Sequence, residues 1–106
     1  MINYEDFKKL EIKTAKVLDA REHPSADRLY VLDIDIGNEK RQIVAGIREH
    51  YSPQELVGRN IVVIVNLEPA IIRGIESNGM LLAASGNDTL SILTPDRDIP
   101  AGSGVK

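Results

Sequence analysis

Two histidines and two closely spaced acid pairs are the side chains of this sequence best suited to binding a metal or transferring a proton. His23 and His50 have no cysteine partner and lie far apart, so their spacing does not match a zinc site. The acids of segments 33–35 and 96–98 belong to no calcium-binding loop. No nucleophile is paired with a base, and no phosphate-cradling glycine loop is present. We therefore predict no catalytic residue, no metal site and no cofactor.

The composition indicates one domain spanning residues 1–106. Hydrophobic residues make up 42% of the chain, enough for a core without covalent cross-links, and there is no cysteine. No segment approaches the ~20 apolar residues that cross a bilayer, and residues 1–10 are too polar for a secretory signal. We expect a cytoplasmic protein with no membrane partner.

The distribution of charge limits how this chain could bind a nucleic acid. The net charge is −3, and nine of the 13 Lys and Arg residues lie in residues 1–48 beside nine acids. Residues 49–106 contain four basic and seven acidic residues. Strong unspecific binding to nucleic acid depends on a broad excess of cations over the phosphates. Any such surface must therefore be local and modest.

Short alternations of apolar and polar residues, separated by turn residues, predict a mainly β protein with two short helices. Asn3 is placed to cap a helix over residues 4–10, and the sequence SPQE at 52–55 forms a capping box for a second helix that stops at Gly58. A bulge near Ala15 would explain the uneven alternation of the first strand. Strands are predicted over residues 11–22, 29–36, 41–47, 60–66, 80–84 and 90–93.

The order of these elements predicts an all-β, five-stranded OB-fold Greek-key barrel. Its short helix lies between strands three and four, and a short N-terminal helix precedes the barrel. A β-sandwich would need about seven strands, which are hard to find here. We divide the domain into the N-terminal helix (1–10), the barrel (11–94) and a C-terminal extension (95–106).

Four segments resemble the tRNA-binding domain family. They read FKKLEIKTAKVLDAREHPSADRLYVLDIDIG, RQIVAGI, YSPQELVGRNIVVIVNLEP and RGIESNGMLLAAS, and HPSADRLY and ESNGMLLAA are the most specific parts. The resemblance runs from about Phe7 to Lys106. This family includes the C-terminal domain of many methionyl-tRNA synthetases and free-standing structure-specific tRNA-binding proteins. It implies an OB fold, a homodimer, tRNA recognition mainly by shape, and a methionyl-tRNA synthetase catalytic chain as partner.

Three candidate tRNA-binding residues rest on this resemblance. Arg28, within HPSADRLY, could contact a phosphate, or it could be a solvated arginine paired with Asp27. Ser77 and Met80 match the family's S-x-G-M signature, in which the serine could bond phosphate or base and the methionine could lie under a base. The alternative is turn chemistry around Asn78-Gly79 with a methionine in the core.

Three further candidates, Tyr30, Asn66 and Arg73, come from the predicted barrel surface. Tyr30 could stack on a base, as aromatic residues on OB barrels do, although its apolar position favours packing in the core. Asn66 ends a predicted buried strand and could donate to RNA or form a turn. Arg73 lies beside Gly74, which allows close backbone approach, and as the one cation retained in its loop it is the favoured electrostatic contact.

The loop before Arg73 departs from the family pattern. The family usually has basic residues there, whereas this sequence has Glu68, Ala70 and Ile71. Each lost phosphate contact lowers the affinity and its salt dependence. The favoured function is a non-catalytic accessory module that binds tRNA and assists or dimerises methionyl-tRNA synthetase. The alternative is an assembly and dimerisation module with a weakened RNA surface, in which exposed isoleucines contact a protein.

Overall fold

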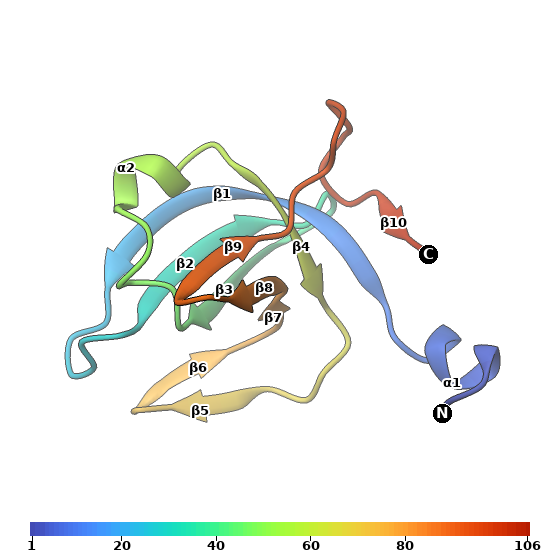
Figure 1. Cartoon of the computed structure of the whole chain (residues 1–106), viewed down its shortest axis with the longest axis horizontal. Helices are drawn as coiled ribbons and strands as arrows, with labels where there is room; N and C mark the ends of the chain where they lie inside the picture. Colours follow the sequence, from blue (N-terminus) through green and yellow to red (C-terminus); the bar gives the residue numbers. More distant parts are fainter.

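The computed structural model describes all 106 residues and shows one strongly curved sheet with two small hairpins beside it (Figure 1). The main sheet has the strand order β3-β2-β1-β4-β7, and β10 pairs with β1. The hairpins are β5–β6 and β8–β9. The elements are α1 (Tyr4–Lys8), β1 (Ile12–Glu22), β2 (Tyr30–Asp35), β3 (Lys40–Ala45), α2 (Pro53–Leu56), β4 (Asn60–Ile64), β5 (Ala70–Ile72), β6 (Ile75–Ser77), β7 (Met80–Leu81), β8 (Ala83–Gly86), β9 (Thr89–Ile92) and β10 (Gly104–Val105).

The long strand β1 organises the sheet because each half pairs with a different neighbour. Residues 12–16 pair with β4 and residues 16–22 pair with β2, both antiparallel. The predicted bulge is displaced: the register shifts between Val17 and Asp19, whereas Ala15 is buried and pairs regularly with Ile61. The extra residue is Leu18, which is exposed, so the bulge turns a hydrophobic side chain outward while the core alternation continues.

The core lies inside the curve of the main sheet. Its buried side chains come mainly from β1 to β4, and Leu56 of α2 and Ile92 of β9 complete it. The predicted alternation is confirmed, because Leu32 and Ile34 of β2 and Ile43 of β3 are fully buried. The two predicted caps are also confirmed: the Asn3 side chain accepts the Asp6 N–H, and the second helix has the complete capping box.

Isolated hydrogen bonds, rather than a strand ladder, join β3 to the β5–β6 hairpin and the residue after it. The Val44 N–H donates to Ser77 Oγ at 2.9 Å, and the Asn78 N–H donates to the Gln42 carbonyl at 2.9 Å. The Gln42 amide also donates to the Glu76 carbonyl at 2.9 Å. The all-β class with two small helices is thus confirmed. The five-stranded Greek-key barrel stays a prediction, because the main sheet is a curled half-barrel whose edge strands β3 and β7 form no ladder with each other.

The β5–β6 hairpin is an element that the sequence patterns did not predict. Its turn is Arg73-Gly74, and both residues have positive φ, 50° and 87°. The tight hairpin turn whose twist matches that of its strands requires positive φ at both central residues.

The predicted strand over residues 80–84 is divided between β7 and β8, which belong to different sheets. Neither helix is long enough to cross a membrane.

Candidate RNA-binding surface

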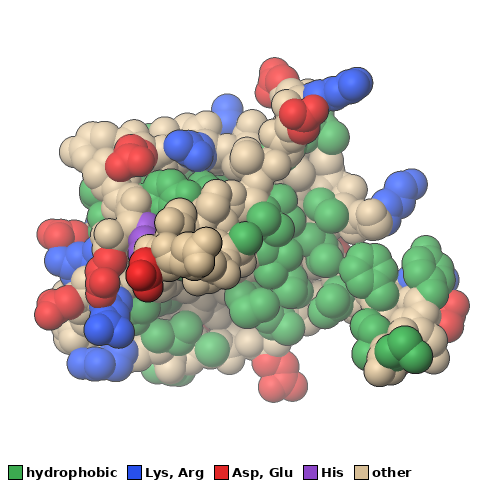
Figure 2. All heavy atoms as spheres, in the orientation of Figure 1, with side chains coloured by type: hydrophobic (Ala, Val, Ile, Leu, Met, Phe, Trp, Pro, Cys, Tyr) green, Lys and Arg blue, Asp and Glu red, His purple; other side chains and the backbone are tan.

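A hollow of about 440 Å³ lies between the β1–β2 loop (residues 23–29) and the tip of the β5–β6 hairpin. It is lined by residues 25–29 and Arg73, and we call it the arginine hollow. In Figure 1 the loop and the hairpin tip lie at the same end of the molecule, where Figure 2 shows Lys, Arg, Asp and Glu side chains gathered together. The fold therefore brings together Arg28 and Arg73, two predicted site residues from distant segments.

Arg73 fixes the hairpin tip to the β1–β2 loop and still presents positive charge. Its Nη2 donates to the Ser25 carbonyl at 3.0 Å, while the residue is exposed and forms no ion pair. A guanidinium has five N–H donors, so most of them remain available to an anion. Arg73 is therefore the uncompensated cation of the hollow.

Arg28 is the second cation of the hollow, and an acid partly neutralises it. Its side chain is 84% exposed, and its Nε lies 2.9 Å from Glu49 Oε1. The sequence predicted Asp27 as the alternative ion-pair partner of Arg28, and this is wrong, because the partner is Glu49. Exposed ion pairs contribute about 0–1 kcal/mol, so a phosphate can replace the glutamate at little cost.

Three other predicted site residues are engaged in contacts within the protein. Tyr30 is buried and its hydroxyl donates to the Tyr51 carbonyl at 2.6 Å, as the core alternative predicts. Ser77 is 3% exposed and joins β3 to β6. Asn66 is on the surface, but its amide accepts the Glu11 N–H at 2.8 Å and donates to the Lys9 carbonyl at 2.7 Å. These side chains therefore hold other parts of the fold together and do not line the hollow.

Met80 lies at the surface, 46% exposed, so its alternative prediction as a core methionine is wrong. It lines a small apolar cavity of about 160 Å³ with Leu67, Ala70 and Ile72. This cavity shares no lining residue with the arginine hollow. Met80 is thus a candidate for an apolar contact, separate from the two cations.

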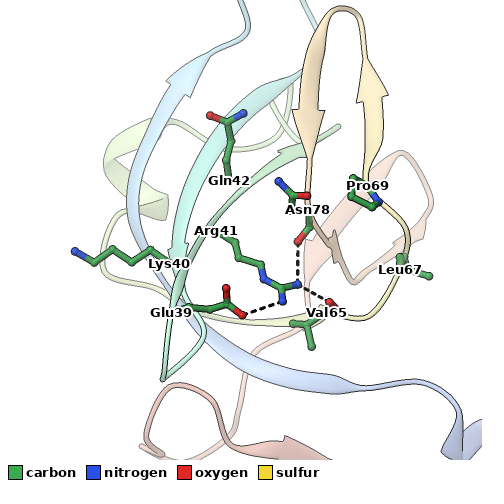
Figure 3. A pocket seen from close by; sticks show the side chains of 8 residues that line it. All are labelled: Glu39, Lys40, Arg41, Gln42, Val65, Leu67, Pro69 and Asn78. Atoms are coloured by element: carbon green, nitrogen blue, oxygen red, sulfur yellow. Dashed lines mark hydrogen bonds and ion pairs between the residues drawn. The ribbon is translucent and has the colours of Figure 1, made fainter.

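Arg41, which no sequence pattern singled out, closes the base of the β5–β6 hairpin. Its guanidinium points into a hollow of about 420 Å³ and donates to the Val65 and Asn78 carbonyls and to Glu39, whereas Lys40 points away (Figure 3). Arg41 therefore has a structural role. The full lining of this hollow is Glu39, Lys40, Arg41, Gln42, Val65, Leu67, Pro69 and Asn78.

Two side chains with shifted pKa values, Arg21 and Glu55, lie away from the arginine hollow. The hydrogen bond from Arg21 to Asp33 raises the pKa of Arg21, so this arginine stays charged and paired on the sheet surface. The Ser52 backbone N–H donates to the Glu55 carboxylate and lowers the pKa of Glu55. The Arg21–Asp33 interaction therefore neutralises a cation outside the hollow. The Ser52–Glu55 hydrogen bond stabilises the capping box of α2.

Comparison with known proteins identifies the family. Residues 12–104 match the tRNA binding domain family over most of the chain. The chain belongs to the tRNA-binding domain family. A methionine–tRNA ligase of Thermotoga maritima is 56% identical over 104 residues, which are 98% of this chain and 16% of that protein. The chain spans only 14–16% of the length of methionine–tRNA ligases such as this one.

Two solved structures share the fold over the whole chain. A methionyl-tRNA-synthetase-related protein of Pyrococcus horikoshii has a TM-score of 0.93 at 33% identity and covers 100% of this chain and 98% of its own. The chaperone CsaA of Bacillus anthracis has a TM-score of 0.90 at 30% identity, with 100% and 99% covered. The resemblance stated from the sequence is therefore confirmed.

Proposed function

We propose that this chain is a non-catalytic module that binds tRNA mainly through its folded shape. The observation that supports this most directly is the convergence of Arg28 and Arg73 on one exposed hollow, in a member of a tRNA-binding family. No aromatic ring lines the hollow, and Tyr30 is buried. Cations without a stacking platform favour contacts to phosphates over contacts to bases, and phosphate contacts fix position rather than read sequence.

We further propose that the module assists a methionyl-tRNA synthetase in the cytoplasm. The support is the similarity to a short region of methionine–tRNA ligases. Two weak tRNA sites held together can raise the overall affinity by ~100-fold or more without any new contact. A binding hollow with only two cations gains most from such a connection.

Homodimerisation is the next part of the proposal. Figure 2 shows hydrophobic side chains gathered over β7, the β4–β5 connection and α1. An exposed apolar area of this kind is typical of a protein interface. Exposed large apolar residues in or directly beside these elements are Ile2, Tyr4, Leu10, Leu67 and Met80. A second copy covering this face would bring two arginine hollows into one particle, which analytical ultracentrifugation can test.

One observation favours the alternative of an assembly module with a weakened RNA surface. Ile71 is 69% exposed on β5 and pairs with exposed Glu76 on β6, while Glu68 is exposed in the connection just before β5. An apolar side chain between acids suits a protein partner better than a phosphate chain. Under this alternative, Ile71→Ser would weaken binding to the synthetase and leave tRNA affinity unchanged.

The deciding experiment is a fluorescence-anisotropy titration of tRNA at two salt concentrations with protein of known oligomeric state. We expect Arg73→Glu to lower the affinity about tenfold and to reduce the salt slope by about one unit, with the fold retained. Arg97→Glu is the matched control, because it makes the same charge change on the C-terminal extension, outside the hollow.

Two results would contradict the tRNA proposal. Absence of binding up to about 50 µM at low salt would remove tRNA as the ligand, because even unspecific sites bind in this range. Equal losses of tRNA affinity for Arg73→Glu and Arg97→Glu would show that the contact surface lies outside the hollow. Retained synthetase binding in either case would favour the assembly alternative.

A further inference from the structure

We propose that neutral His23, with its proton on Nε2, is a positioning residue that holds the two sides of the arginine hollow at a fixed separation. This inference rests on the proposed function, because it concerns how Arg28 and Arg73 meet tRNA together. His23 is the first residue of the β1–β2 loop, and its ring is buried at 3% exposure. No role in binding follows from the sequence for this histidine.

The hydrogen bonds of the ring determine its tautomer. The Ser25 N–H lies 3.1 Å from Nδ1, and the Ile72 carbonyl oxygen lies 3.1 Å from Nε2. A backbone N–H can only donate and a carbonyl can only accept, so Nδ1 has the lone pair and Nε2 has the proton. Both ring nitrogens are then satisfied, and only the neutral form satisfies both.

These two bonds join the segments that present the arginines. Ile72 immediately precedes Arg73, and Ser25 is the residue whose carbonyl accepts from the Arg73 guanidinium. The His23 N–H also donates to the Leu29 carbonyl at 3.1 Å and closes the base of the loop that contains Arg28. The ring is therefore the buried connection between loop and hairpin, and the Arg73–Ser25 bond is the exposed one.

Protonation of the ring would break this connection. A proton on Nδ1 would face the Ser25 N–H, donor against donor, and the buried charge would lack a counter-ion. No carboxylate forms an ion pair with the ring, and the neighbouring acids Glu22 and Glu49 are paired with Arg48 and Arg28. The charged and titratable groups on the surrounding segments are Glu22, Asp27, Arg28, Arg48, Glu49 and Arg73.

The sign of the resulting pH effect is opposite to that of simple electrostatics. Acidification makes a protein of net charge −3 less negative and should strengthen its attraction to RNA. Protonation of His23 would release the loop and would instead weaken tRNA binding. If His23 only stabilised the fold and did not affect the hollow, acidification would not lower the tRNA affinity.

Two substitutions separate the two hydrogen bonds. His23→Asn keeps an acceptor near Nδ1 for the Ser25 N–H but is too short to reach Ile72, whereas His23→Gln extends an N–H toward the Ile72 carbonyl. By anisotropy at pH 7.5, we expect His23→Asn to lower tRNA affinity roughly three- to tenfold, the fold-change of about one hydrogen bond. His23→Gln should stay within about twofold of the wild type. Urea denaturation of both variants confirms that they are folded.

The pH arm uses the same titration from pH 7.5 to 5.5, with the protonation of the His23 ring followed by NMR. Wild-type affinity should fall over the range in which the ring titrates, and His23→Gln should lack this fall. His50→Gln is the control, because His50 is exposed and should leave the fall unchanged. A ring that titrates without a change in affinity, or equal affinities for the Asn and Gln variants, would overturn the inference.

An NMR measurement keeps this test separate from the tRNA proposal. Contacts between Ser25 and Arg73 should be present in the wild type and in His23→Gln, and they should be lost in His23→Asn. If the wild type binds no tRNA but shows this pattern, only the proposed function fails. If tRNA binds and the contacts persist in all three proteins, only the role of His23 fails.

Discussion

Ser77→Ala tests whether the signature serine supports the structure or contacts RNA. Ser77 Oγ accepts the Val44 N–H at 2.9 Å and donates to the Gly79 carbonyl at 3.1 Å, and the side chain is buried. Alanine would leave a buried N–H of strand β3 without its partner. An unsatisfied buried donor costs about 1–3 kcal/mol, and the Gly79 carbonyl loses a further bond. We therefore expect the free energy of unfolding to fall by about 2–3 kcal/mol.

Urea denaturation followed by circular dichroism measures this change. With a denaturant slope of about 2 kcal/mol/M, the midpoint should fall by about 1 M. Ser91→Ala is the matched control on the exposed side of β9 and should stay within about 0.5 kcal/mol of the wild type. An unchanged midpoint together with a tenfold loss of tRNA affinity would refute this reasoning, because the hydroxyl would then contact RNA.

Four further predictions concern charges and caps. Glu49→Gln frees Arg28 from its exposed ion pair, so tRNA affinity measured by anisotropy should rise about two- to fivefold; a decrease would show that the pair positions Arg28 for binding. Glu68→Lys should raise the affinity and steepen its salt dependence by about one unit, and if it does neither, that loop does not face RNA. Ser52→Ala should lower the free energy of unfolding by about 1 kcal/mol in urea denaturation, because α2 loses its cap. The pKa of Glu55 is lowered in the folded state, so its stabilisation is complete above its ordinary value of 4.5 and is lost as the pH falls through the lower folded value. Glu55→Ala should abolish this acid-limb dependence, and its persistence would assign it to other groups.

Local patterns predicted the elements whose determinants lie within a few residues. The alternation of Leu32 and Ile34 depends only on the two-residue period of a strand, and the capping box at 52–55 depends on residues three apart. The β5–β6 hairpin was missed because its turn needs a positive φ at Arg73, which an arginine rarely adopts and which no residue type there signals. The apolar run at Ile71-Ile72 was also too short to distinguish a strand from a loop.

The site could be predicted only in part because its contacts are tertiary. Arg28 and Arg73 could be named from residue type, but their meeting in one hollow depends on the hairpin. The sequence predicted Asp27 as the partner of Arg28, but the partner is Glu49, because the segment after β3 returns to the β1–β2 loop. His23 looked like an isolated histidine, since its partners are a nearby backbone N–H and the carbonyl of Ile72, far along the chain.

The scarcity of free cations around the hollow supports the proposal that this surface selects folded tRNA by shape. Around the hollow, Arg28 and Arg48 are paired with acids, and only Arg73 has no acidic partner. Long-range attraction is then weak, and binding becomes favourable only when one ligand presents phosphates to Arg28 and Arg73 together. A flexible single strand must lose conformational freedom to do this, whereas a folded tRNA already holds its phosphates in place. A low salt slope, near two units, is therefore the expected accompaniment of shape-selective binding, and affinity must come from joining several such sites.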